Sequence, residues 1–280
     1  MRIAVTGASG FLARHIVPEI RRAGHEPVLL LREGRTPLPG MEDLRVARFD
    51  LCQPPSDAFD VLGSPDLLIH LAWGGLPNYR SLHHIEEELP AQYRFLRGLI
   101  DAGLKHVVVS GTCFEYGMQS GELDESTHPR PANPYGFAKD SLRVMLEFLR
   151  TSRAFHLTWA RLFYLHGDGQ AENSILPQLR RAVENRDEVF NMSGGEQLRD
   201  YLAAPRFAAD FVRLALTHQH HGIVNVCSGQ PISVRTLVER EIADHGWDIR
   251  LNRGHYPYPD HEPMAFWGSR AKLDRLLASP

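Results

Sequence analysis

The sequence predicts an α/β protein built on a doubly wound parallel sheet, with a smaller C-terminal lobe. Short runs rich in Val, Ile and Leu alternate with longer helix-compatible segments, a pattern typical of crossover connections between parallel strands. The apolar runs show little polar alternation, as expected for strands that are covered on both faces. Near residue 166 this regular pattern gives way to segments interrupted by Gly, Asn and Pro.

Composition favours a folded chain that acts on a small molecule. The 280 residues are 43% hydrophobic and 23% charged, so the chain can bury a substantial core. The net charge of -3, without a long basic run, argues against nucleic acid or an anionic membrane as the main partner. The N-terminus shows no secretory leader, and no stretch approaches the roughly 20 apolar residues of a membrane span. We expect a cytoplasmic protein with reduced cysteines.

The expected elements follow in chain order. Strands are predicted at residues 3–5, 28–31, 44–49, 67–71 and 107–110, with helices at 11–23, 91–102 and 135–149. Two later apolar runs, 157–165 and 223–227, can extend the same sheet. This pattern assigns residues 1–165 and 201–228 to the sheet domain, and residues 166–200 and 229–280 to the lobe.

The first strand leads directly into a glycine-rich turn, Thr6-Gly7-Ala8-Ser9-Gly10-Phe11-Leu12-Ala13. Glycine permits a tight turn and lets backbone N–H groups approach a pyrophosphate, which the N-terminus of the following helix also attracts. An ordinary strand-to-helix connection can look the same. The position of the turn directly after the first strand favours a dinucleotide site of the Rossmann type.

An arginine at the end of the second strand bears on the choice of cofactor. Sites for NAD usually carry an acidic residue there for the ribose 2′-hydroxyl, whereas an arginine suits a 2′-phosphate. Here Leu31 is followed by Arg32, with Arg35 nearby, and a guanidinium matches phosphate well. Solvated loop arginines would give the same pattern. We expect NADP(H), with NAD(H) as the alternative.

A phenol and an ammonium lie four residues apart at Tyr135 and Lys139, on one face of a predicted helix. A nearby cation can lower the pKa of a phenol, which normally lies near 10, toward the range useful for acid–base work on an alcohol or carbonyl. Thr112 follows the fifth strand, at the sheet edge where open α/β folds bind ligands. A solvated helix face and a turn-forming threonine are the alternative interpretations.

Five motifs occur in one order along the chain: TGASGFL, Asp50-Leu51 after the third strand, His70-Leu71-Ala72 ending the fourth, SGTCFEYG after the fifth, and Tyr135-xxx-Lys139. Later segments, ARLFYLHGDGQ, residues 174–177, GGEQLRDYL and VNVCSG, continue the series. The combination resembles the extended short-chain dehydrogenase/reductase family of the NAD-dependent epimerase/dehydratase type. It points to the branch that acts on nucleotide-diphosphate sugars.

The resemblance implies a role for each matching residue. Tyr135 is the expected catalytic acid/base, Lys139 its partner, and Thr112 the third catalytic residue. The implied cofactor-binding residues are Gly7, Ser9, Gly10, Phe11, Leu12, Arg32, Asp50, Leu51, Leu71, Ala72, Trp73, Ser110, Tyr135 and Lys139. The implied substrate-binding residues are Thr112, Cys113, Asn173, Ser174 and Arg199, with Arg199 near the diphosphate.

Departures from the family pattern narrow the expected reaction. Dehydratases of this family carry Asp and Glu directly after the catalytic Thr, whereas this chain has Cys113 and Phe114. Neither side chain suits acid–base work at neutral pH, so dehydration is not expected. Glu88 stands where relatives often have an asparagine, and Pro205-Arg206 replaces a usual acidic pair.

The expected activity is NAD(P)H-dependent reduction of the keto group of a nucleotide-diphosphate 4-keto-6-deoxyhexose, or the reverse oxidation. A nucleotide-sugar 4-epimerase with tightly bound NAD is the alternative, because it would use the same three residues. A non-catalytic NADP-sensing regulator on this fold would ordinarily have lost Tyr135 or Lys139, and both are present.

Two further expectations concern metals and assembly. Fifteen histidines suggest metal binding, but no carboxylate or thiol lies at ligand spacing on a clear element, so we expect no metal. A homodimer is expected through helices 91–102 and 135–149. Leu142, Met145, Leu146 and Leu149 recur at helical spacing, which permits such pairing but would equally serve packing on the sheet.

Overall fold

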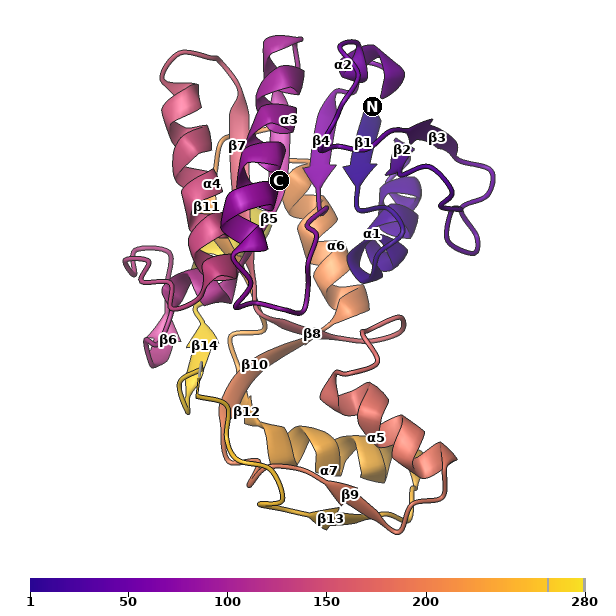
Figure 1. The fold of residues 1–280 in the computed structure, drawn as a ribbon, viewed down its shortest axis with the longest axis vertical. Helices are drawn as coiled ribbons and strands as arrows, with labels where there is room; N and C mark the ends of the chain where they lie inside the picture. The colour runs from indigo at the N-terminus through magenta and orange to yellow at the C-terminus, as the bar shows by residue number, and fades with distance from the viewer. Residues whose placement is uncertain (261, 279–280) are drawn as a thin grey trace.

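Seven parallel strands form the central sheet, in the order β11-β7-β5-β4-β1-β2-β3 (Figure 1). The computed structural model describes residues 1–260 and 262–278. The strands are β1 (Arg2–Thr6), β2 (Glu26–Leu31), β3 (Arg45–Arg48), β4 (Leu67–His70), β5 (His106–Thr112), β7 (His156–Leu162) and β11 (Gly222–Val226). The strand order reverses between β1 and β4, and open α/β sheets bind ligands at such a point. The predicted fold class is confirmed.

The register of the central strands brings three carboxyl ends together. Thr6 of β1 pairs with His70 of β4, and His70 pairs with Val109 of β5. These strands are apolar along nearly their whole length and are buried on both faces, which explains why the sequence shows no polar alternation.

Helices cover both faces of the sheet. On one face lie α1 (Phe11–Arg22), α6 (Ala204–Ala215) and α8 (Ala271–Ala278), and on the other α2 (Ala58–Val61), α3 (Leu89–Asp101) and α4 (Pro134–Arg150). A π-helical turn (His84–Glu88) precedes α3, and a 3₁₀ turn (Cys113–Tyr116) follows β5. Leu142, Leu146 and Leu149 of α4 are buried against the sheet. The stripe considered for dimerisation therefore serves the core, and the homodimer stays a prediction.

The smaller lobe lies below the carboxyl ends of the central strands (Figure 1). It contains the sheet β12 (Pro231–Ser233), β10 (Leu198–Ala203) and β8 (Tyr164–His166), the pair β13 (Arg250–Asn252) and β9 (Val189–Asn191), and helices α5 (Ile175–Glu184) and α7 (Val234–His245). A fourth sheet pairs β14 (Phe266–Gly268) with β6 (Gly121–Leu123). Leu179, Phe190 and Val238 belong to the core of the lobe.

Two details differ from the sequence prediction. The apolar run 157–165 is not one strand of the central sheet, because the chain leaves that sheet after Leu162 and β8 pairs with β10 instead. The last helix, α8, falls within the predicted lobe, yet its Leu273 is buried in the core of the central sheet. Within the described residues, no helix combines the length and apolar character needed to cross a bilayer.

Candidate active site

The turn between β1 and α1 is shaped by glycine. Gly7 adopts φ +66°, and a Cβ on it would lie 2.9 Å from the Ala72 backbone nitrogen. A side chain there would collide with the main chain that follows β4. The Gly10 N–H donates to the Gly7 carbonyl (2.9 Å), and Gly10 then caps the start of α1. The turn therefore leaves its backbone open to the groove, as a bound pyrophosphate requires.

A pocket of about 290 Å³ lies at the point where the strand order reverses. It is lined by residues at the carboxyl ends of β2, β3 and β4 and by the glycine-rich turn. The predicted cofactor residues that line it are Gly7, Ser9, Gly10, Arg32, Asp50, Leu51, Leu71, Ala72 and Trp73. The predicted residues Phe11, Leu12, Ser110, Tyr135 and Lys139 are not among its lining. The shape and the donor set suit a dinucleotide.

A chain of hydrogen bonds runs beneath this pocket. The Thr6 hydroxyl bonds to His70 Nδ1 (3.0 Å), and His70 Nε2 bonds to Gln92 Oε1 (2.8 Å). Gln92 Nε2 in turn donates to Glu88 Oε2 (2.7 Å). Glu88 and Gln92 also line the pocket. In the sequence, Glu88 stands out only as a departure from the family pattern, and its acidic side chain is the one signal that it could belong to the site.

Thr112, Tyr135 and Lys139 come together at the carboxyl end of β5. Tyr135 and Lys139 lie in the first turns of α4, which begins after the cap residue Asn133. Lys139 Nζ donates to the Ser110 carbonyl (2.8 Å) and lies 4.2 Å from the centre of the Trp73 ring. Burial raises the pKa of Tyr135, and the nearby Thr112 hydroxyl has a smaller, opposing effect, so the two hydroxyls lie close to each other. Trp73 links these three residues to the pocket, because it lines that pocket as well.

Burial is the largest influence on the electrostatics of the Tyr–Lys pair. Burial raises the pKa of the Tyr135 phenol, and nearby Tyr79, Glu115 and Cys113 raise it further. Burial also lowers the pKa of Lys139 to about 7, against the opposing effect of Glu115 and Glu88. Burial thus dominates the pKa of both groups, and the lowering of the phenol pKa by Lys139 stays a prediction. Both groups are desolvated, and a dry environment disfavours the charged form of each.

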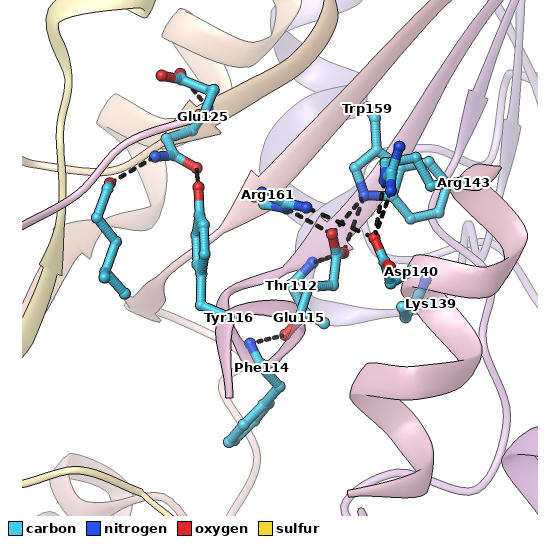
Figure 2. Close-up of polar contacts among 12 residues, drawn as sticks. Thr112, Phe114, Glu115, Tyr116, Glu125, Lys139, Asp140, Arg143, Trp159 and Arg161 are labelled. Atoms are coloured by element: carbon cyan, nitrogen blue, oxygen red, sulfur yellow. Dashed lines mark hydrogen bonds and ion pairs between the residues drawn. The ribbon is translucent and has the colours of Figure 1, made fainter. Parts of the chain in front are cut away.

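Buried charges support the loop that carries Thr112 (Figure 2). The Thr112 N–H donates to Glu115 Oε1 (2.8 Å), and Phe114 N–H donates to the Thr112 hydroxyl (3.3 Å), which completes a capping box. Glu115 Oε2 accepts a hydrogen bond from Arg161 Nε (2.5 Å), and Trp159 Nε1 also donates to the carboxylate. Glu115 and Arg161 are both fully buried.

Sequence reasoning missed a set of aromatic rings around Tyr135. The ring centre of Tyr135 lies 6.0 Å from Trp73, 5.5 Å from Tyr79, 5.3 Å from His84 and 6.2 Å from Phe114. The Tyr135 N–H also donates to the Tyr79 carbonyl (3.2 Å). The density of aromatic residues after β4 was the only signal in the sequence, and it does not say which ring they contact.

Hydrogen bonds fix the segment that supplies three of these rings. Trp73 Nε1 donates a hydrogen bond to His84 Nδ1 (3.1 Å), so Nδ1 is the acceptor nitrogen of that ring. The other nitrogen, His84 Nε2, therefore carries the proton and donates it to the Asn78 carbonyl (2.9 Å). Burial, with Cys113 and Glu262 nearby, raises the pKa of Tyr79. Residues 73–84 are therefore held in place by hydrogen bonds beside the Tyr135 phenol.

The predicted substrate residues are placed unequally. Cys113 is buried beside Thr112, and burial raises the pKa of its thiol. Arg199 is 2% exposed, and its guanidinium is held by Glu262 Oε2 at 2.8 Å. Its charge is thus matched by Glu262 within the protein, and its place near the diphosphate stays a prediction. Asn173 and Ser174 precede α5 on the surface of the lobe.

The described histidines do not gather into a metal site. Across the parts of the chain that the structure describes, no group of three His, Cys, Asp or Glu side chains could hold an ion. His106 and His156 lie instead at the amino ends of β5 and β7, where their rings stack with centres 4.8 Å apart.

Comparison with known proteins identifies the family. The model of the NAD dependent epimerase/dehydratase family matches residues 3–227. The dTDP-6-deoxy-L-talose 4-dehydrogenase (NAD(+)) of Aggregatibacter actinomycetemcomitans is 33% identical over 96% of this chain and 100% of its own length. The GDP-6-deoxy-D-mannose reductase of Pseudomonas aeruginosa is 30% identical over 85% of this chain and 78% of its own.

A solved structure agrees with these relatives. MoeE5 in complex with UDP-glucuronic acid and NAD matches with a TM-score of 0.83 and 28% identity, covering 99% of this chain and 92% of that one. The chain therefore belongs to the NAD dependent epimerase/dehydratase family, among the extended short-chain dehydrogenases/reductases, and is an NAD(P)-dependent oxidoreductase.

Proposed function

We propose that this protein reduces the C4 keto group of a nucleotide-diphosphate 4-keto-6-deoxyhexose with NAD(P)H, or catalyses the reverse oxidation. The observation that carries the proposal is the grouping of Thr112, Tyr135 and Lys139 beside the dinucleotide pocket. Cys113 and Phe114 support reduction over dehydration, because they supply no acid or base where dehydratases have two carboxyl groups. The names of the two relatives, a 4-dehydrogenase and a reductase of 6-deoxy sugars, point the same way.

The residues of the chain would hold the substrate and manage one proton. The nicotinamide ring, when bound, supplies or accepts the hydride. The hydroxyls of Thr112 and Tyr135 would bind the C4 oxygen, and Tyr135 would donate its proton to that oxygen as reduction proceeds. The raised pKa of the buried phenol keeps it in the protonated form that donates. Lys139, as an ammonium ion, would stabilise the phenolate that remains.

The choice of cofactor rests on opposing observations. Arg32 and Arg35 line the pocket at the end of β2, which supports the preference for NADP(H). The relative at 33% identity is named for NAD(+). We propose NADP(H) as the favoured cofactor. Steady-state kinetics with NADPH and NADH should then favour NADPH, and Arg32→Ala should remove most of that preference while Glu33→Ala leaves it unchanged.

Activity on a panel of sugar nucleotides tests the proposal. The purified protein is assayed with dTDP-, GDP-, UDP- and CDP-linked 4-keto-6-deoxyhexoses, following NADPH and NADH at 340 nm. We expect turnover on one of them, and a loss of at least about 100-fold in kcat for Tyr135→Phe with cofactor affinity nearly unchanged. Tyr93→Phe on α3 is the matched control. Full activity of Tyr135→Phe would contradict the mechanism.

Epimerisation is distinguished by the nucleotide that the protein retains. Several proteins of similar fold are named as epimerases, including the UDP-glucuronic acid 4-epimerase of Bacillus cereus. An epimerase re-reduces its own intermediate and keeps its cofactor. Stoichiometric NAD released from the denatured protein, together with interconversion of C4 epimers without added cofactor, would favour that activity over the proposed one.

A further inference from the structure

Two aromatic side chains stand together beside the proposed reaction centre. The rings of Phe114 and Tyr79 lie 4.8 Å apart, and both flank Tyr135. Figure 2 shows the Phe114 ring directed away from the buried Glu115–Arg161 pair. Neither ring is fully buried, so part of each faces open space. The proposed mechanism gives this pair no role.

The position of Phe114 relative to the reacting oxygen is set by the backbone. Its N–H donates to the Thr112 hydroxyl, so Phe114 lies two residues after a group proposed to hold the C4 oxygen and is hydrogen-bonded to it. Tyr79 is fixed from the other side, because its carbonyl accepts the Tyr135 N–H. A substrate whose C4 oxygen sits between Thr112 and Tyr135 therefore brings an adjoining ring carbon toward these two rings.

The chemistry of the sugar decides which side of the sugar ring can pack against Phe114 and Tyr79. Carbon C4 has two neighbours, C3 with its hydroxyl and C5 with the exocyclic C6. A hydroxyl against the faces of two aromatic rings would lose its hydrogen bonds to water without replacement, which is unfavourable. A methyl group at C6 gains by burial on the same surface. Only the C5–C6 side of a 6-deoxyhexose is apolar enough to match.

Resting on the proposed function, we infer that Phe114 and Tyr79 form an apolar wall that binds the C6 methyl of a 6-deoxyhexose and discriminates against a C6 hydroxyl. The two residues are thus specificity-determining residues of the sugar site. The rings, and not the Tyr79 hydroxyl, carry the discrimination.

The test compares two sugars that differ in one oxygen atom. The purified protein is assayed in the oxidative direction with dTDP-6-deoxy-L-talose and dTDP-L-talose, and with the matching GDP-linked D-talose pair, using NAD(+) and NADP(+). A hydrophobic pocket typically rejects an added hydroxyl by roughly 100-fold in kcat/KM. We expect a preference for the 6-deoxy sugar on the order of 10- to 100-fold.

Variants identify the residues that produce the preference. Phe114→Asn should reduce the preference about tenfold, because kcat/KM should fall for the 6-deoxy sugar and rise for the 6-hydroxy sugar. Phe114→Leu, which keeps an apolar surface, and Tyr79→Phe, which keeps the ring, should both retain it. Phe148→Asn, at an exposed position (70%) on α4, is the matched control for the change in residue type.

Each outcome separates this inference from the proposed function. If both sugars are oxidised at equal kcat/KM, or if Phe114→Asn keeps the preference unchanged, the inference about Phe114 and Tyr79 is wrong, while the oxidoreductase assignment stays intact. Loss of the preference in Tyr79→Phe shows that the hydroxyl carries it and also overturns the inference. Oxidation of no sugar in either pair, combined with no turnover across the keto-sugar panel, would defeat the proposed function and the wall with it.

Discussion

Lys139 is a buried cation whose charge depends on carboxylates from two different elements. Burial lowers its pKa to about 7, whereas Glu115 and Glu88 act to raise it. Glu88 comes from the turn before α3 and Glu115 from the turn after β5. A protein that needs an ammonium ion here at neutral pH must offset the desolvation of Lys139, and these carboxylates provide the offset.

Replacing Glu88 with Gln should therefore change the pH dependence of turnover. Without the carboxylate, the pKa of Lys139 falls, so the ammonium form is lost at lower pH. We expect the basic limb of the kcat/KM profile to move to lower pH, with about a threefold loss at pH 8 and near wild-type activity at pH 6. Glu87→Gln, whose carboxylate is exposed, should leave the profile unchanged. A uniform loss at every pH would indicate a structural effect only.

The Glu115–Arg161 pair offers a second residue-scale prediction. Both side chains are 0% exposed, and the Arg161 guanidinium also lies 3.6 Å from Asp140 Oδ1. Removing one partner of such a pair typically costs about 3–5 kcal/mol, because the other charge stays buried. Glu115→Val should lower the free energy of unfolding in urea by about this amount.

The double variant controls for the loss of packing. Glu115→Val with Arg161→Met replaces both charges by apolar groups, which is often nearly neutral for stability. We expect it to recover part of the lost free energy of unfolding, because the Thr112 N–H and the Trp159 Nε1–H still lack the acceptor that Glu115 supplies. A double variant no more stable than Glu115→Val alone would show that the cavity and these two donors, and not the charge of Arg161, cause the loss.

Among the elements, α4 matters most because its first two turns carry Tyr135 and Lys139, the two groups proposed to be catalytic. Asn133 Oδ1 accepts the Gly136 N–H at 2.8 Å, and Pro134 occupies the first turn. This cap fixes the helix start one residue before Tyr135. Asn133→Ala should lower the free energy of unfolding by about 1 kcal/mol and reduce kcat more than it changes KM, since the phenol loses its fixed position.

The conservative variant completes this test. Asn133→Asp keeps an acceptor at the cap and should restore both stability and kcat, as measured by urea unfolding and steady-state kinetics. If Asn133→Ala lost stability while kcat stayed at the wild-type value, the cap would serve the helix alone and not the position of Tyr135.

The elements that the sequence predicts well are those governed by local pattern. Strands such as β1 and β4 are continuous apolar runs, and their type follows from burial on both faces. The run 157–165 was wrongly predicted to be a single strand, because an apolar sequence does not indicate which sheet a strand joins. Its last residues form β8, which pairs with a strand more than thirty residues later. The placement of residues 73–84 was not predicted, because their ring contacts depend on how the segment folds back over α4.

Charge placement was the weakest part of the prediction at the scale of the site. Arg199 carries the expected charge, but Glu262 neutralises it, and a single sequence does not show that two residues 63 positions apart will pair. The Tyr135–Lys139 spacing correctly indicated a shared helix face. It could not indicate that burial would dominate both pKa values, since burial is a property of the assembled cleft.

For the whole molecule, buried histidines make stability depend on pH. Burial, with a smaller effect of Lys139, lowers the pKa of His70 to about 3 from the ordinary value of 6.5. Burial also lowers the pKa of His106, His220 and His221. Below pH 6.5 the unfolded chain binds protons at these histidines that the folded chain does not, so their contribution to the free energy of unfolding falls as pH decreases.

His70 alone should account for a loss of about 2 kcal/mol between pH 7 and pH 5, because it is fully buried and its neutral ring links Thr6 to Gln92. Urea unfolding at a series of pH values measures this. His70→Gln should be less stable at pH 8 but should lose about 2 kcal/mol less on acidification, whereas the exposed His255→Asn should keep the wild-type slope. An unchanged slope in His70→Gln would mean that other groups set the acid sensitivity.

The hydrogen bonds that begin at Thr6 end at Glu88, which lines the proposed cofactor pocket. A bound dinucleotide stabilises only the folded state, so it should raise the free energy of unfolding at every pH.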